Sequence, residues 1–186
     1  MKFLIASDIH GSLSACRNLL SAYDREGAAR LILLGDLLYH GPRNPLSDEY
    51  NPGEAARMLN TLAEEILCVR GNCDAEVDQM LLSFPIMADY AVLQAGEHLI
   101  FMTHGHLFGK DKLPPVKKGD VYLTGHTHVP ALLEKDGILY ANPGSVGLPK
   151  NGSESGYLLL EKETFYLKNI KGDVISNYSI SSLGML

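Results

Sequence analysis

The stretch KFLIASDIHG, residues 2–11, joins a short apolar run to an aspartate, a histidine and a glycine. An apolar run of this length is typical of a strand buried on both faces. The apolar residues that come next recur at helical spacing: Leu13, Cys16, Leu19, Leu20 and Tyr23. One face of a helix can therefore pack on the strand. A buried strand followed by an amphipathic helix indicates a βα unit, and so an α/β fold.

The same pattern of apolar runs followed by polar residues recurs in the first half of the chain. RLILLGD, at 30–36, predicts a second buried strand, and ILCVRGNCD, at 66–74, predicts a third strand and its loop. NPGE, at 51–54, predicts the start of a helix, because Asn51 can cap it and Pro52 suits its first turn.

The second half is more antiparallel in character. The stretches YAVLQ (90–94), HLIFMTHGH (98–106) and VYLTGHTH (121–128) indicate strands with short connections, and two hairpins are predicted at 131–144 and 156–170. We therefore expect two packed mixed β-sheets flanked by helices. The length suits a single domain, which we place at residues 1–180, with 181–186 as a loose tail. The antiparallel C-terminal hairpins offer an edge for a second copy, which is compatible with a homodimer or a higher homo-oligomer.

Composition excludes several classes of function. The formal net charge is −6 and no basic tract is present, which argues against strong nucleic-acid binding. No apolar run approaches the roughly 20 residues that span a bilayer, so no membrane association is expected. Cys16, Cys68 and Cys73 show no C-x-x-C spacing, and an odd number of cysteines indicates free thiols. A cytoplasmic location is therefore expected.

Polar residues follow five of the apolar runs, in the segments SDIHG, LLGDLL, VRGNCD, THGH and TGHTH. The carboxyl ends of strands in an α/β sheet meet at one edge, where ligands bind. These segments offer seven candidate ligands of a divalent metal: Asp8, His10, Asp36, Asn72, His104, His126 and His128. Seven exceed the needs of one tetrahedral zinc. They suit two metals about 3.5–4 Å apart, an arrangement that serves displacement at phosphorus.

The ordered set D-x-H, G-D, G-N, H-G-H and G-H-T-H resembles the signature of the calcineurin-like metallophosphoesterases, over Asp8 to about Ser145. The small size and the GNCD variant are most similar to compact bacterial phosphodiesterases of the YfcE type. The resemblance implies a first metal held by Asp8, His10 and His128, a second held by Asn72, His104 and His126, and Asp36 as the bridge. It also implies manganese as the usual metal, while the ligands equally accept iron, zinc, nickel or cobalt.

One departure from the family pattern concerns the leaving group. Many relatives have a histidine after G-N, whereas this chain has Cys73 followed by Asp74. A thiol, with a reference pKa of about 8.5, lacks the positive charge of an imidazolium. We predict catalytic roles for Asn72, Cys73, Asp74 and His106, with His106 either supporting a metal ligand or facing the substrate. The missing imidazole would favour singly charged diesters over dianionic monoesters.

Three functions remain open at this level. The first is a metal-dependent hydrolase of small phosphodiesters, working through an activated hydroxide. The second is a phosphomonoesterase or protein phosphatase, against which Cys73 argues. The third is a protein-binding scaffold on the same fold, which the complete set of ligand positions disfavours. For NPGS, at 142–145, a turn is favoured over a part in the site.

Overall fold

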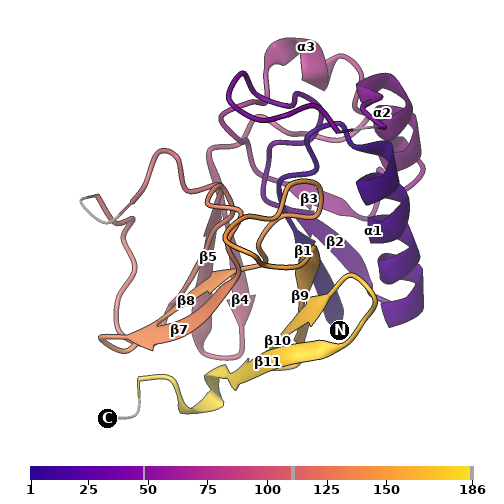
Figure 1. The fold of residues 1–186 in the computed structure, drawn as a ribbon. Coiled ribbons are helices and arrows are strands. Elements are labelled where there is room, and N and C mark those ends of the chain that lie inside the picture. The colour runs from indigo at the N-terminus through magenta and orange to yellow at the C-terminus, as the bar shows by residue number, and fades with distance from the viewer. Residues whose placement is uncertain (48, 110–111, 185–186) are drawn as a thin grey trace.

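Two β-sheets pack face to face, and the helices lie beside only one of them (Figure 1). The structure, a computed structural model, describes residues 1–47, 49–109 and 112–184. Within these ranges no helix is long and apolar enough to cross a membrane. The predicted pair of packed mixed sheets is thus confirmed, with the helices gathered on one side.

The first sheet has six strands, in the order β11-β10-β9-β1-β2-β3. Its pairs β1–β2 and β2–β3 are parallel, whereas β9, β10 and β11 join by antiparallel pairing. The bounds are β1 Lys2–Ala6, β2 Arg30–Leu33, β3 Ile66–Cys68, β9 Gly156–Glu161, β10 Thr164–Asn169 and β11 Val174–Ser179. The strand β11 was not predicted from the sequence. It forms an edge of the sheet and is largely exposed.

The second sheet has five strands, in the order β4-β5-β6-β8-β7. The pairs β5–β6 and β6–β8 are parallel, and the two outer strands join by antiparallel pairing. The bounds are β4 Tyr90–Ala95, β5 His98–Thr103, β6 Val121–Leu123, β7 Ala131–Lys135 and β8 Ile138–Asn142. Asp136 and Gly137, both with positive φ, make the predicted turn between β7 and β8.

Alternate residues of the central strands serve two separate cores. In β1, Leu4 packs toward the helices, whereas Ile5 packs into the space between the sheets. In β2, Leu31 and Ile32 divide in the same way. Because successive side chains of a strand point to opposite faces, a strand covered on both faces must be apolar throughout. This explains the unbroken apolar runs that precede the polar segments.

Helices α1 (Leu13–Glu26) and α2 (Pro52–Asn60) cover the outer face of the first sheet (Figure 1). The side chain of Ser12 caps α1, and that of Asn51 caps α2 by accepting a hydrogen bond from the Glu54 N–H at 3.1 Å. The short helix α3 (Glu76–Gln79) was not predicted. Cys16 is fully buried in this core, Cys68 packs against it, and all three cysteines are free.

The segment expected to be a loose tail is described as far as residue 184. A 3-10 turn, η1 (Ile180–Ser182), follows β11, and Leu183 is 3% exposed in the core between the sheets. Residues 185 and 186 lie outside the described ranges.

One partly buried ion pair fixes the end of α1 to the first sheet. The carboxylate of Glu26 accepts hydrogen bonds from the Tyr157 hydroxyl and the Lys168 ammonium, both at 2.6 Å. Burial raises the pKa of Glu26, but these two hydrogen bonds outweigh it, so the pKa lies below its ordinary value. Ionised Glu26 therefore stabilises the fold above the unfolded-state pKa of about 4.3, and this contribution is lost as the pH falls through the lower, folded-state pKa.

We predict that Glu26→Gln lowers the free energy of unfolding by about 1–3 kcal/mol at pH 7. The deficit should shrink as the pH falls below about 4, where the parent carboxylate is protonated too. Urea denaturation across this pH range measures both effects. Glu161→Gln is the matched control, because its pair with Lys2 is 3.8 Å long and exposed, and it should cost little. Equal losses at every pH would contradict the prediction.

Candidate metal centre

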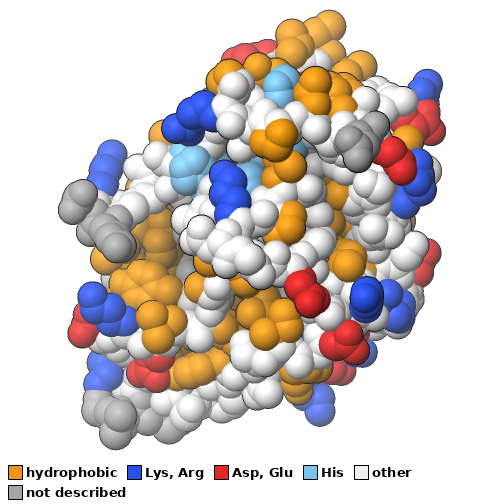
Figure 2. All heavy atoms as spheres, in the orientation of Figure 1, with side chains coloured by type: hydrophobic (Ala, Val, Ile, Leu, Met, Phe, Trp, Pro, Cys, Tyr) orange, Lys and Arg blue, Asp and Glu red, His pale blue; other side chains and the backbone are white. Residues whose placement is uncertain are grey.

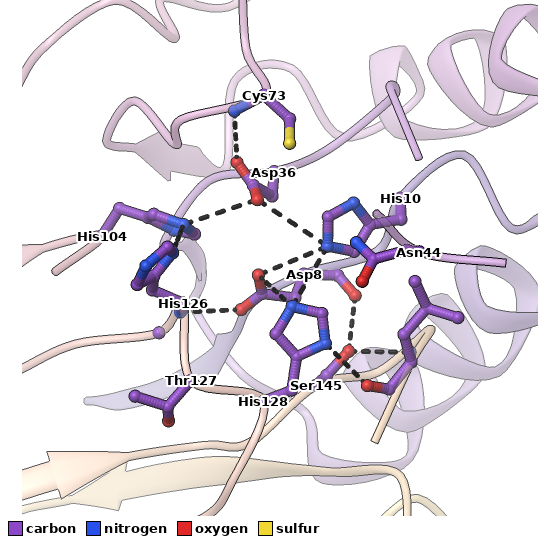
Figure 3. A network of polar contacts seen from close by, with 12 residues as sticks. Asp8, His10, Asp36, Asn44, Cys73, His104, His126, Thr127, His128 and Ser145 are labelled. Carbon is purple, nitrogen blue, oxygen red and sulfur yellow. Dashed lines mark hydrogen bonds and ion pairs between the residues drawn. The ribbon is translucent and has the colours of Figure 1, made fainter. Parts of the chain in front are cut away.

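The seven candidate ligands lie at the carboxyl ends of parallel strands. Asp8 and His10 follow β1, Asp36 follows β2 and Asn72 follows β3. In the second sheet, His104 follows β5, and His126 and His128 follow β6. The strand ends of both sheets open to the same side, so the two groups of side chains face one another (Figure 3).

The backbone of this region is strained. Five of the candidate ligands have a left-handed backbone, with φ between 52° and 65°: Asp8, His10, Asp36, His126 and His128. This conformation is uncommon in residues other than glycine, and it persists only where the surrounding structure enforces it. Hydrogen bonds from Asp8 N to Gly35 O, at 3.1 Å, and from His10 N to Asp36 O, at 3.0 Å, pin the first two loops together. Such strain is typical of functional sites.

The first cluster brings together two imidazoles and a carboxylate. His10 Nε2 lies 3.3 Å from His128 Nε2, and Asp8 Oδ1 lies 3.5 Å from the first and 3.2 Å from the second (Figure 3). Asp36 Oδ2 is 3.7 Å from His10 Nε2. All of these side chains are buried.

The second cluster is built around His104. Its Nε2 atom lies 3.1 Å from Asn72 Oδ1, 3.2 Å from His126 Nδ1 and 3.5 Å from Asp36 Oδ2. The same oxygen of Asp36 thus faces both clusters. The other oxygen of Asp36 is held by the backbone N–H of Cys73, at 2.8 Å.

Backbone carbonyls set the tautomers of three histidines. A carbonyl oxygen only accepts, so each Nδ1 that contacts one must carry the proton. In a neutral ring the Nε2 atom is then a free lone pair, directed at the cluster. The three contacts are His10 Nδ1 with Tyr39 O at 2.9 Å, His104 Nδ1 with Leu34 O at 2.6 Å, and His128 Nδ1 with Leu148 O at 2.6 Å.

The clusters fit divalent cations. Among the described residues, Asp8 Oδ1 is buried without a hydrogen-bond donor, and lone pairs of His10 and His128 point at it. Converging lone pairs and a buried carboxylate require positive charge between them. Imidazole nitrogens with carboxylate and amide oxygens are a donor set for divalent transition metals. Asp8, His10 and His128 form one group able to hold an ion, and Asp8, Asp36 and His104 form another.

The ionisation of the cluster shows the same demand for positive charge. Burial alone would lower the pKa of His104. Its hydrogen bond to Asp36 and the charge of Asp8 outweigh burial and raise the pKa to about 9. For Asp8, burial raises the pKa, but contacts with His10 and His128 outweigh it and hold the pKa well below its usual range. The carboxylates are therefore ionised, and they attract either protons or metal cations to the histidines.

Cys73 lies beside the Asp36 carboxylate. Its thiol accepts a hydrogen bond from the Asn72 side-chain amide at 3.2 Å, and it lies close to His10 and Asp36. Burial and the negative charge of Asp36 raise the pKa of the thiol to about 12. The thiol is therefore protonated and uncharged at neutral pH.

Asp74 is a buried loop anchor. Its carboxylate accepts hydrogen bonds from the backbone N–H groups of Asp36, Leu37 and Gly71, at 2.7–2.8 Å. Both oxygens are thus engaged with backbone. The side chain holds the Asp36 and Gly71 loops at a fixed separation.

His106 stands next to the second cluster. Its ring centroid lies 5.4 Å from that of His104 and 6.4 Å from that of His126. Burial and the charge of His104 lower its pKa, so the ring is neutral at pH 7. Its Nδ1 atom is buried without a partner among the described residues. The ring thus lies beside the second cluster.

Sequence reasoning missed a supporting layer. Ser145 Oγ donates to Asp8 O at 2.8 Å and accepts from Leu148 N at 2.8 Å. The Asn142 side chain donates to Gly125 O at 2.7 Å. The segment 142–145, for which a turn was favoured over a part in the site, therefore ties the loop of Asp8 to that of His126. The orienting carbonyls had no signal in the sequence, because every residue carries one.

Comparisons with known proteins identify the family. Residues 1–164 match the model of the calcineurin-like phosphoesterase superfamily domain. The chain is 47% identical to phosphodiesterase YfcE of Escherichia coli strain K12 over 163 residues, which cover 88% of this chain and 89% of that one. The solved structure of the Escherichia coli YfcE phosphoesterase has a TM-score of 0.93 at 42% identity, covering 97% of this chain and 100% of that one.

A more distant structure shares the fold alone. Vps29 of Entamoeba histolytica, solved in complex with zinc, has a TM-score of 0.64 at 22% identity, covering 97% of this chain and 99% of that one. Together with the match over residues 1–164, these similarities place the chain in the calcineurin-like phosphoesterase superfamily.

Proposed function

We propose that this protein is a divalent-metal-dependent phosphodiesterase that hydrolyses small phosphodiesters. The observation that carries the proposal is the position of Asp36, whose Oδ2 atom faces both clusters of metal-ligand type. The 47% identity to the Escherichia coli phosphodiesterase supports the same reaction class. In this reaction, the oxygen of water bonds to phosphorus, one ester P–O bond breaks, and the released alcohol carries the proton.

We assign the ligands to two ions from the distances within each cluster. The first ion would be held by Asp8, His10 and His128, and the second by Asn72, His104 and His126, with Asp36 shared between them. When bound, two divalent cations lower the pKa of water and offset the charge of the phosphoryl oxygens. We favour manganese for both ions, although iron, zinc, nickel and cobalt accept the same donors.

The remaining residues have supporting roles. The carbonyls behind the three histidines keep each Nε2 lone pair directed inward. Asp74 acts as a positioning residue for Asp36. We assign contacts with substrate to Cys73, which lies beside Asp36, and to His106, which lies beside the second cluster. Each is uncharged at neutral pH, which favours a singly charged diester over a dianionic monoester.

The alternatives receive less support. A phosphomonoesterase or protein phosphatase would gain from a cation where the Cys73 thiol lies. A protein-binding scaffold has no need of the strained backbone and oriented imidazoles described above. The exposed edge at β11 supports a homodimer or higher homo-oligomer, and the free thiols support a cytoplasmic location.

We predict that Asp36→Asn lowers the rate of diester hydrolysis by about 100-fold or more, because it removes the charge shared by both clusters. The measurement uses bis(p-nitrophenyl) phosphate and chelator-stripped protein with manganese restored. Metal content and circular dichroism of the variant separate loss of the centre from loss of the fold. If the parent protein hydrolyses the diester with none of the divalent metals tested, the proposed function is wrong.

Gly71 is predicted to be indispensable because it touches the bridging carboxylate. A Cβ atom at this position would lie 2.1 Å from Asp36 Oδ1 and 2.3 Å from Asp36 N. Gly71→Ala should displace Asp36 and reduce the diesterase rate by about 100-fold, the typical effect of a shift of about 1 Å in a site. Gly53→Ala, whose Cβ would approach only Asn51 Oδ1 at 3.9 Å, should retain the parent rate. Similar rates for both variants would refute the steric argument.

Cys73→His tests whether the side chain at position 73 controls the preference for a diester over a monoester. An imidazole in this place can protonate a leaving oxygen, an effect worth up to about 100-fold here. The rate with p-nitrophenyl phosphate should therefore rise relative to that with bis(p-nitrophenyl) phosphate. Cys73→Ser, which keeps a small uncharged side chain, should preserve the parent ratio. An unchanged ratio in the histidine variant would remove Cys73 from the account of specificity.

A further inference from the structure

The outer face of the second sheet carries a cavity of about 640 Å³. Among the described residues, helices cover only the other sheet (Figure 1), and this face is bordered instead by Gly105, Phe108, Gly109 and Leu113. Figure 2 shows hydrophobic side chains in a hollow below the pale-blue histidines. We call the cavity the lateral pocket; its apolar and aromatic walls are Phe108, Leu113, Tyr122, Ala131, Leu133 and Tyr140.

The floor of the lateral pocket belongs to one row of cross-strand neighbours. Pairing places Leu133 opposite Tyr140, Tyr140 opposite Tyr122, Tyr122 opposite Phe101, and Phe101 opposite Val92. Directly opposite residues share one face of a sheet. The row is therefore apolar or aromatic from β7 to β4. Its two ends, Leu133 and Val92, are 62% and 51% exposed.

A packed segment forms the opposite wall. The Tyr122 hydroxyl donates a hydrogen bond to Phe108 O at 3.1 Å. The Phe108 ring packs edge-on against Phe101, with 5.7 Å between centroids. These contacts fix Phe108 against the sheet at the side of the lateral pocket, so this wall of the pocket is built into the fold.

The lateral pocket borders the candidate metal centre. His126 and Thr127 are among its lining residues, and so are the charged Lys135 and Asp136. The Nδ1 atom of His126 is 3.2 Å from His104 Nε2, within the second cluster. A phosphoryl group at that cluster would therefore lie beside a mostly apolar cavity. The volume lies in the range of about 300–1,000 Å³ that is usual for small-molecule sites.

We propose that the lateral pocket binds one ester arm of the substrate, and that this arm is uncharged and apolar or aromatic. The inference rests on the proposed function, because the phosphoryl group must be held at the metal centre. Its physical basis is that His126 belongs both to the second cluster and to the lining of a mostly apolar cavity, and that burying an apolar arm is favourable whereas burying a charged one is costly. A second copy of the chain covering the same face is the competing occupant.

The test measures binding of linear alkylphosphonates, from methyl to hexyl, to the manganese-loaded protein by calorimetry. These compounds are not hydrolysed, so the readout is independent of turnover. Each methylene that enters the lateral pocket should tighten binding about two- to fourfold. In Leu133→Glu this gain should fall below about 1.5-fold per methylene, because a carboxylate then stands in the pocket wall. Val92→Glu places the same charge at the other end of the row, outside the pocket, and should keep the parent gain.

Each outcome bears on a different claim. Parent diesterase activity with no dependence on chain length would overturn the inference while leaving the proposed function intact. Chain-length dependence without hydrolysis of any diester would overturn the proposed function and, with it, the identification of the arm as substrate. If the parent is a dimer, Leu133→Glu is a monomer and the gain per methylene persists, the face belongs to a second copy and the inference falls.

Discussion

The carboxylate of Asp36 is the group on which the rest of the site depends. One of its oxygens is held by the Cys73 N–H, and the other faces His10 and His104 from opposite clusters. Its backbone is left-handed, and its N–H is bound by the buried Asp74 carboxylate. The Asp36 carboxylate must be held in one orientation, because rotation of the side chain would bring its Oδ2 atom closer to one cluster and move it away from the other. The loops, glycines and anchors around it serve that restriction.

The energetics of the site and of the core are complementary. One hydrophobic core lies on each face of the first sheet, and together they hold its strands rigidly in register. This rigidity lets the strand ends carry strained backbone and ionised carboxylates that would be unfavourable elsewhere. One orienting carbonyl, that of Leu34, directly follows β2, so the direction of the His104 imidazole is set by the packing of the first sheet.

Much of this arrangement could be predicted from the sequence, and the missing part has a physical reason. Apolar runs ending in Asp8 and Asp36 indicated parallel strands whose carboxyl ends meet, and the sheets follow that expectation. The pairing of His104 with Asn72, 32 residues earlier, needed the family signature as well. The function of Asp74 as an anchor was missed, because a carboxylate that accepts backbone N–H groups looks the same in a sequence as one that faces substrate. The edge strand β11 was missed because it is exposed on most of its length and lacks an apolar pattern.

The division of the centre between two sheets has a consequence for how such a protein could be rebuilt. The first sheet supplies both carboxylates, whereas the second supplies three of the four clustered histidines. Each half therefore lacks the chemical complement that the other carries. Combining either sheet with an unrelated partner would transfer its strands and loops without a complete centre. The two sheets must therefore be kept together for the centre to form.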